Sequence, residues 1–287
     1  MKKDLTEYCF PGTDIAEEMV NISGNVSLKI ITFRPPKENN NPKVLFVPGW
    51  ISMIDGWKEV LIEMTKDFVV HYVETREKIS SKAPNQKDFS VERIGLDLVE
   101  IVSKLNLREN NFIFFGSSLG ATAILDCCRY LKTNPVCLVL VGPNAEFKIP
   151  YYGKILIKLF YPPMYNFFKP YVKWYLKTFR LDTKNDYAQY EKYSSVLDFA
   201  DPWKLKKAAK GVSNYSVWNR LKEIQLPVLV IGASKDKLHS PENLKKIVDL
   251  LKFSTYVEMT TNKNTHSKEA VLEIRKYLSN NFNYQFS

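Results

Sequence analysis

Gly116-Ser117-Ser118-Leu119-Gly120 is the most informative segment of this chain, because of the residues on either side of it. It follows an apolar and aromatic run at residues 111–115, typical of a buried strand, and precedes residues 121–131, which are typical of a helix. A Gly-x-Ser-x-Gly motif between a strand and a helix predicts a turn so sharp that its central residue is strained. Side chains two positions before and after that residue would collide, and both positions carry glycine. The pattern therefore predicts that Ser118 stands clear of the sheet at a helix N-terminus, where free backbone N–H groups favour negative charge.

Length and composition fit a soluble globular protein. The 287 residues suffice for one large core or for a core with a modest inserted domain. Hydrophobic residues make up 45% and charged residues 25% of the chain, and 41 Lys and Arg against 31 Asp and Glu give a formal charge of +10. The first residues lack the apolar stretch of a signal peptide, and no apolar run is long enough to span a membrane, so we expect neither feature. Its four cysteines include no CxxC pair, so we expect reduced thiols, no disulfide framework and a cytoplasmic location.

Strands and helices are predicted to alternate along most of the chain. Apolar runs predict strands at residues 26–33, 43–47, 68–73, 136–141, 226–231 and 255–259, and helical spacing predicts helices at 56–65, 91–105, 241–251 and 268–280. This alternation implies a parallel sheet covered by helices on both faces. From about residue 145 to about residue 219 the sequence is helical and aromatic, without a strand pattern. We therefore expect a core formed by residues 1–144 and 220–287, with residues 145–219 inserted as a helical cap or lid.

Four further segments, in this order, carry a resemblance to a known family. Val44–Trp50 resembles that family's strand ending in His-Gly, and Tyr72–Arg76 resembles its later strand ending in Asp-x-Arg-Gly. Ser90–Glu92 resembles the entry to the helix before the serine turn, and Ile231–Pro241 resembles a Gly-x-x-x-Asp-x-x-x-x-Pro segment. On these markers the chain is similar to the α/β-hydrolase superfamily over roughly residues 25–282. The resemblance implies the α/β-hydrolase fold, with a mostly parallel sheet flanked by helices and a cap inserted after the strand that follows the elbow helix.

A serine nucleophile needs a base, and the base needs an orienting carboxylate. The chain has three histidines. His71 lies inside a predicted strand, where we expect a structural imidazole, and His239 follows Asp236 by three residues, where we expect it at a loop rim. His266 lies in a polar loop before the last helix, where the resemblance places the catalytic base. The predicted triad is therefore Ser118, Asp236 and His266, in the order that this fold uses.

The resemblance also implies two backbone N–H donors that stabilise the oxyanion. Leu119, directly after the nucleophile, supplies one; the other is assigned to Trp50, with Ile51 as a nearby candidate. An alternative acid position follows the strand after the elbow, where this chain has Asn144 and Glu146. Glu146 stays open as an alternative, although Asp236 fits the local pattern better.

Three positions depart from the family pattern. Pro48 stands where histidine is common, Glu77 replaces the glycine after Arg76, and Thr265 replaces the glycine often found before the base. These changes affect loop geometry and leave the three catalytic residue types intact.

The nucleophile predicts the class of reaction. Epoxide hydrolases and haloalkane dehalogenases on this fold use aspartate at the elbow, whereas Ser118 suits acyl transfer through an acyl-enzyme. We expect a serine hydrolase that cleaves a carboxylic ester, with a C–C bond hydrolase or a thioesterase on the same triad as the nearest alternatives. A hydrolase-fold protein that binds a ligand or partner without turnover is a further alternative. No phosphate-binding loop or metal-ligand cluster is present in the sequence, so we expect no cofactor and no metal.

The predicted cap carries the information about the substrate. Between Phe147 and Leu181 there are twelve aromatic residues, seven Lys or Arg and no Asp or Glu. Its lysines recur at intervals of four and predict basic stripes on helices: Lys154 and Lys158, then Lys169, Lys173 and Lys177. One interpretation is a lid whose apolar face covers a site for a lipophilic ester while the lysines are solvated. A second adds peripheral contact with an anionic membrane surface. Nucleic-acid binding is not expected, because no recognised binding motif is present.

Overall fold

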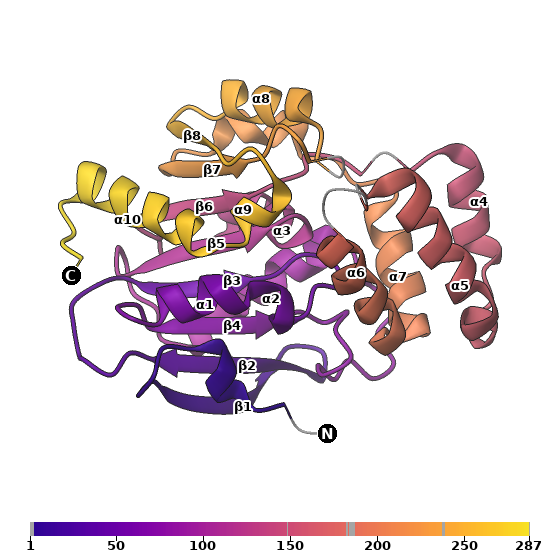
Figure 1. Ribbon diagram of the computed structural model, residues 1–287, viewed down its shortest axis with the longest axis horizontal. Helices are drawn as coiled ribbons and strands as arrows, with labels where there is room; N and C mark the ends of the chain where they lie inside the picture. Colours follow the sequence, from indigo (N-terminus) through magenta and orange to yellow (C-terminus); the bar gives the residue numbers. More distant parts are fainter. Residues whose placement is uncertain (1–2, 148, 182, 184–186, 237–238, 287) are drawn as a thin grey trace.

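The computed structural model describes residues 3–147, 149–181, 183, 187–236 and 239–286 (Figure 1). Within these residues, an eight-stranded sheet has the strand order β1-β2-β4-β3-β5-β6-β7-β8. The strands are β1 (Asp14–Ile22), β2 (Val26–Arg34), β3 (Lys43–Val47), β4 (Val70–Glu74), β5 (Phe112–Ser117), β6 (Cys137–Val141), β7 (Val228–Gly232) and β8 (Ser254–Glu258). The pairs β1–β2 and β2–β4 are antiparallel and the other pairs are parallel, which confirms the predicted sheet.

Strand β1 was not predicted from the sequence. It pairs with β2 along its whole length, from Asp14 opposite Arg34 to Ile22 opposite Val26. It forms the edge of the sheet, and most of its side chains are exposed or half-buried. An edge strand of this kind buries little apolar surface, so it lacks the apolar run by which the inner strands were predicted.

Helices cover both faces of the sheet and create two layers of core. The helices of the core are α1 (Lys58–Met64), α2 (Val91–Lys104), α3 (Leu119–Cys127), α8 (Pro241–Leu250), α9 (Asn262–Thr265) and α10 (Lys268–Phe282). Helices α2, α3 and α8 pack on one face, and α1 and α10 pack on the other. Successive side chains of a strand point to opposite faces, so Leu45 of β3 joins the first layer and Phe46 the second. The five helices predicted in the core, including the one after the serine turn, are confirmed.

In the described part of the chain between β6 and β7, four α-helices are present: α4 (Tyr151–Leu159), α5 (Tyr165–Tyr175), α6 (Tyr187–Phe199) and α7 (Pro202–Val212). Figure 1 shows them grouped beyond one end of the sheet, with α4 farthest out. We call residues 151–212 the helical insert. Helix α7 packs closely on the core, because a Cβ atom on Gly211 would lie 2.4 Å from the carbonyl oxygen of Phe89. The cap boundaries at residues 145 and 219 stay a prediction.

Short helical turns complete the described structure: η1 (Leu5–Tyr8), η2 (Ile54–Trp57), η3 (Cys128–Tyr130), η4 (Pro162–Met164), η5 (Leu176–Arg180) and η6 (Trp218–Glu223). None of the helices in the described ranges is both long and apolar enough to cross a lipid bilayer.

Candidate active site

The serine turn has the strained geometry that its sequence predicts. Ser118 joins β5 to α3 and has φ 49° and ψ −114°. A residue other than glycine adopts this conformation only where its surroundings hold it tightly. A Cβ atom on Gly116 would lie 2.8 Å from the backbone of Ala121, and one on Gly120 would lie 2.3 Å from the carbonyl oxygen of Val47. The two glycines are therefore required by close backbone approach, and the predicted turn is confirmed.

Polar neighbours hold Ser118 and its helix in place. The side-chain amide of Asn144 donates to Ser118 Oγ at 3.4 Å, and the Ser118 N–H donates to the carbonyl oxygen of Val141 at 3.0 Å. The Thr122 hydroxyl is shared between the carbonyl oxygens of Ser118 and Asn144, at 2.9 and 2.7 Å. Asn144, which stands at the alternative acid position after β6, thus contacts the serine itself.

The segment after β3 forms a tight turn against Ser118. The N–H of Ser52 donates to the carbonyl oxygen of Gly49 at 3.1 Å, and Ile51 has φ 48°. A β-branched residue in this region stores strain of about 1–3 kcal/mol, which marks a turn held by its surroundings. A Cβ atom on Gly49 would lie 3.3 Å from Ser118 Cβ, so no larger residue fits there without movement.

Two backbone amides of this region were predicted as oxyanion donors. Leu119 is the first residue of α3, where helix N–H groups have no partner within the helix. Trp50 follows Gly49 in the tight turn, and its backbone N–H has no acceptor within the described part of the protein. Both amides therefore belong to segments that touch at Ser118, as an oxyanion hole requires.

Asp236 lies on the loop after β7 and is buried. Its Oδ2 accepts a hydrogen bond from the side-chain amide of Asn262 at 2.7 Å and lies 2.8 Å from Nδ1 of His239. The expectation that His239 lies at a loop rim is wrong. The residue is only 9% exposed, and its imidazole packs against Gly142, which has φ 52° and at which a Cβ atom would lie 3.1 Å from the ring. Pairing with a buried carboxylate is what draws this histidine inward.

His266 follows α9 and stacks on Trp57, with ring centroids 4.1 Å apart. Its Nδ1 lies 3.0 Å from the backbone carbonyl oxygen of Asn262 and 3.0 Å from Oγ1 of Thr265. A hydrogen bond to the carbonyl places the proton on Nδ1 and leaves Nε2 as the acceptor of a neutral ring. Asn262 therefore binds Asp236 with its side chain and His266 with its backbone.

One small cavity connects these groups. Asp236, His239, Asn262 and His266 line it together with Ser117, the residue before the predicted nucleophile. The structure thus gathers the predicted acid and base at the same edge of the sheet as the serine turn. It also adds His239 and Asn262, which sequence reasoning did not select. Within the described residues, no three His, Cys, Asp or Glu side chains gather as a metal site.

His71 has a different role from the other two histidines. It lies in β4, is buried, and its Nδ1 is 2.9 Å from the Thr32 hydroxyl. Burial, helped by the nearby charges of Lys43 and Arg34, lowers the pKa of His71 to about 4. The predicted structural role of this imidazole is confirmed.

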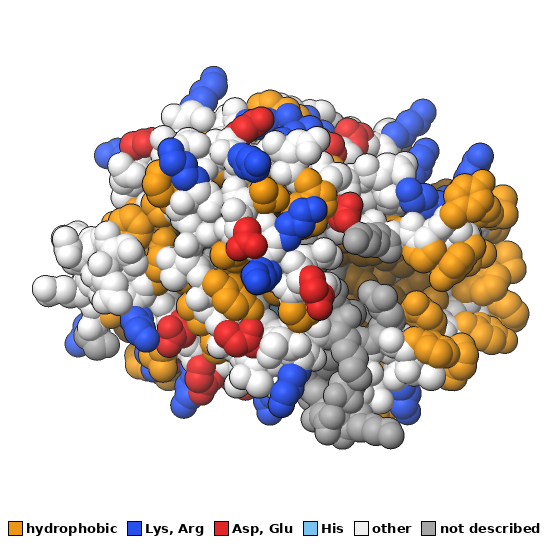
Figure 2. Space-filling view, turned by 90° about the horizontal axis from the view of Figure 1, so that it is seen from above, with side chains coloured by type: hydrophobic (Ala, Val, Ile, Leu, Met, Phe, Trp, Pro, Cys, Tyr) orange, Lys and Arg blue, Asp and Glu red, His pale blue; other side chains and the backbone are white. Residues whose placement is uncertain are grey.

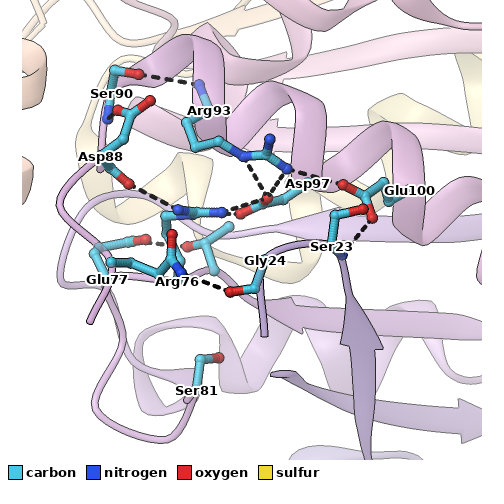
Figure 3. Close-up of polar contacts among 12 residues, drawn as sticks. Ser23, Gly24, Arg76, Glu77, Ser81, Asp88, Ser90, Arg93, Asp97 and Glu100 are labelled. Atoms are coloured by element: carbon cyan, nitrogen blue, oxygen red, sulfur yellow. Dashed lines mark hydrogen bonds and ion pairs between the residues drawn. The ribbon is translucent and has the colours of Figure 1, made fainter. Parts of the chain in front are cut away.

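A buried ion pair fixes the segment that follows β4, as Figure 3 shows. Nε and Nη2 of Arg76 donate to the two carboxylate oxygens of Asp97, each at 2.6 Å, and Nη1 donates to the carbonyl oxygen of Asp88 at 2.8 Å. Arg93 adds a second guanidinium to Asp97 and also reaches Glu100, at 2.8 and 2.9 Å. Bidentate pairing defines both the position and the orientation of the Arg76 guanidinium, so the segment around Arg76 is held rigidly against α2.

The outer surface of the helical insert is apolar and aromatic (Figure 2). Tyr151 is 80% exposed, Leu159 73% and Trp174 59%. The other large exposed side chains of α4, α5 and the turns beside them are Tyr152, Ile155, Leu156, Tyr161, Met164, Phe167, Phe168, Tyr171, Val172, Tyr175 and Phe179. We call this set, with Tyr151, Leu159 and Trp174, the aromatic surface. The aromatic surface is larger than the exposed apolar patches of most soluble proteins, whose surface apolar residues are usually scattered.

The lysines of α5 face the neighbouring helix. Lys169 and Lys173 lie 3.1 and 2.8 Å from the carboxylate of Asp198 on α6, and both lysine side chains are half-buried. The lid interpretation, in which apolar side chains face inward and lysines face water, is therefore wrong for this helix. The ion pair across α5 and α6 turns Lys169 and Lys173 towards α6, and the aromatic side chains of α5 are left on the outside.

Comparisons with known proteins give the fold. No family model matches the chain, and no curated protein matches it in sequence. Among solved structures, it resembles an enol-lactonase from Burkholderia xenovorans LB400, with a TM-score of 0.74, 15% identity, and coverage of 91% of this chain and 98% of that one. It also resembles a thermophilic esterase from Thermogutta terrifontis, with a TM-score of 0.74, 17% identity, and coverage of 93% of this chain and 98% of the esterase. A third similar structure is a membrane phospholipase A, described as a bacterial virulence factor. Its TM-score is 0.69 at 14% identity, and the match covers 96% of this chain and 88% of the phospholipase. This likeness shows that the chain has the α/β-hydrolase fold.

Proposed function

We propose that this protein is a serine hydrolase that cleaves a carboxylic ester with an apolar acyl chain. The observation that carries the proposal is the strained Ser118, held at the N-terminus of α3 with the Gly49 turn packed against it. Strain of this kind is maintained where a side chain must be presented at a fixed place. The enzymes among the structural neighbours support the same class of reaction.

In the proposed mechanism Ser118 Oγ attacks the ester carbonyl while His266 Nε2 accepts its proton. The backbone N–H groups of Trp50 and Leu119 stabilise the oxyanion, and loss of one such donor costs about 3–4 kcal/mol of transition-state stabilisation. Collapse expels the alcohol, which takes the proton from His266, and water then hydrolyses the acyl-enzyme by the same route. Asp236 stabilises the charged imidazole, and its contact with Asn262 supports this role because Asn262 also binds His266.

The aromatic surface supports a lipophilic substrate and a contact with lipid. Exposed aromatic side chains bury their rings at the boundary between lipid headgroups and acyl chains, and nearby lysines add attraction to anionic lipids. Lys158 and Lys177 are exposed beside this surface. We therefore propose that the helical insert acts as a cap whose outer face rests on an anionic membrane surface, from which an acyl ester can reach Ser118.

Labelling with a fluorophosphonate tests the proposed hydrolase. The wild-type protein should be labelled at Ser118, and Ser118→Ala should abolish both labelling and hydrolysis of p-nitrophenyl esters. Ser117→Ala is the matched control, because this neighbouring hydroxyl should not react. Labelling that persists in Ser118→Ala would contradict the assignment of the nucleophile.

The same esters test the acyl preference. Each CH₂ group buried in an apolar pocket contributes up to about 0.8 kcal/mol, so kcat/KM should rise from acetate to octanoate by at least roughly tenfold. A flat series would contradict the lipophilic substrate and leave the serine hydrolase in place.

A further inference from the structure

Lys78 is a buried cation that the proposed mechanism does not use. Its side chain is only 7% exposed, and its ammonium donates to the carbonyl oxygen of Gly49 at 2.5 Å. The second partner is Glu77, whose Oε1 lies 3.2 Å away. Burial lowers the pKa of Lys78, opposed by the charge of Glu77. Removing an ammonium from water is costly, so a lysine is found in such a place only where its contacts compensate for that loss.

The contact with Gly49 determines the direction of the next amide. The peptide plane between Gly49 and Trp50 is rigid and trans, so its C=O and N–H groups point in opposite directions. Lys78 and the N–H of Ser52 hold the carbonyl oxygen from one side. The N–H of Trp50 is therefore directed away from Lys78, and within the described residues nothing in the protein accepts its hydrogen bond. The strained φ of Ile51 belongs to the same turn.

The segment that carries Lys78 is itself held at two points. Arg76 binds Asp97 and fixes its start, as described above (Figure 3). Further along, the ammonium of Lys204 on α7 donates to the carbonyl oxygens of Lys78 and Ser81, at 2.6 and 2.5 Å. A continuous series of contacts therefore runs from the helical insert through residues 78–81 to the Gly49 turn.

We propose that Lys78 is a positioning residue for the oxyanion hole, holding the Gly49 carbonyl so that the N–H of Trp50 faces the reacting carbonyl oxygen, and that Lys204 couples this arrangement to the insert. The proposal rests on the proposed serine hydrolase. The contribution of Lys78 is greatest in the transition state, because the carbonyl oxygen of the substrate carries a full negative charge only there.

Lys78→Met tests this role, since it keeps most of the side-chain length and removes the ammonium. We expect kcat for a p-nitrophenyl ester to fall roughly 10- to 100-fold while KM changes less than about threefold. Affinity for a trifluoromethyl ketone, which forms a tetrahedral oxyanion on serine, should fall by the same factor as kcat/KM. Lys78→Arg, which retains a cationic donor, should recover part of kcat. A general loss of structure would not produce this separation of kcat from KM.

Lys204→Met and Lys207→Met form a matched pair on α7. Lys207 also donates to a backbone carbonyl of the core, that of Gln86 at 2.7 Å, but it does not contact residues 78–81. We expect Lys204→Met to lower kcat roughly three- to tenfold and Lys207→Met to leave it unchanged, with similar thermal stability in both variants.

The outcomes separate the two proposals. Wild-type kcat and ketone affinity in a folded Lys78→Met variant would overturn the positioning role and leave the serine hydrolase standing. If Lys78→Met does not fold, the comparison of Lys204→Met with Lys207→Met decides, and equal kcat values in these two would overturn the proposal. A wild-type protein that does not react with fluorophosphonate would contradict the hydrolase and, with it, the role of Lys78.

Discussion

Nδ1 of His239 lies 2.8 Å from Oδ2 of Asp236, so the predicted acid is bound to a histidine that was not predicted as its partner. The same carboxylate oxygen accepts the side-chain amide of Asn262, whose backbone carbonyl faces Nδ1 of His266. The Asp236 carboxylate is therefore linked to both imidazoles. It contacts His239 directly, and Asn262 connects it to His266.

The first prediction concerns the base. His266→Ala should lower kcat by at least about 10³-fold, because Ser118 loses its proton acceptor, whereas His239→Ala should stay within about tenfold of wild type. Asp236→Asn should cost about 10⁴-fold, since the charged imidazole loses its stabilising carboxylate. The measurement is kcat on a p-nitrophenyl ester, with fluorophosphonate labelling as a second readout. An inactive His239→Ala beside an active His266→Ala would assign the base to His239.

The second prediction concerns the aromatic surface. Trp174→Ser combined with Phe179→Ser should weaken co-sedimentation with lipid vesicles, because both exposed rings are removed from the proposed contact. Leu272→Ser is the control, since Leu272 is an exposed apolar residue on α10, at the opposite end of the molecule in Figure 1. Equal binding by the double variant and the control would contradict the membrane contact.

The third prediction tests the charge of the lysines that lie between α5 and α6, beside the aromatic surface. Asp198→Asn should strengthen binding to anionic vesicles roughly fivefold, because it releases Lys169 and Lys173 from their shared carboxylate and each net charge contributes about 1 kcal/mol. The gain should shrink as salt is raised and should be missing with neutral vesicles. A gain that persists in high salt would mean that the effect is not electrostatic.

The fourth prediction concerns the Arg76–Asp97 pair, in which both side chains are only 1% exposed. Arg76→Ala should lower the free energy of unfolding by about 3–5 kcal/mol, because a carboxylate is left buried with fewer partners. Arg34→Ala removes an exposed pair with Asp14 and should cost less than about 1 kcal/mol. Urea denaturation of both variants provides the comparison, and similar losses would show that burial does not determine the cost.

The fifth prediction concerns pH. The pKa of His71 falls from an unfolded value near 6.5 to about 4, so the unfolded state binds more protons between these values. Stability should therefore be complete above pH 6.5 and decrease as the pH falls towards 4. At pH 4.5 the free energy of unfolding of wild type should have fallen, relative to pH 7, by about 2–3 kcal/mol more than that of His71→Gln. Parallel pH profiles for the two proteins would contradict this role of His71.

The sequence alone predicted the serine turn and most of the sheet. The glycine pattern of the turn was visible in the sequence, but only Gly116 is required by a contact close in the chain, with the backbone of Ala121. Gly120 is required by the approach of Val47 on β3. The inner strands were found because they are buried on both faces and their apolar runs are continuous. The edge strand β1 was missed because Glu17 and Glu18 interrupt its apolar residues, so its sequence has no apolar run.

The contacts between side chains of distant segments could not be predicted from the sequence, because they depend on how those segments pack. The loops after β7 and β8 are adjacent because their strands pair, and this places Asn262 between Asp236 and His266. Likewise, Asp198 turns the lysines of α5 inward, and Lys78 reaches Gly49 across 29 positions of sequence. A sequence motif reflects the local conformation that its own residues require. These contacts depend instead on strand order and helix packing, which bring distant segments together when the chain folds.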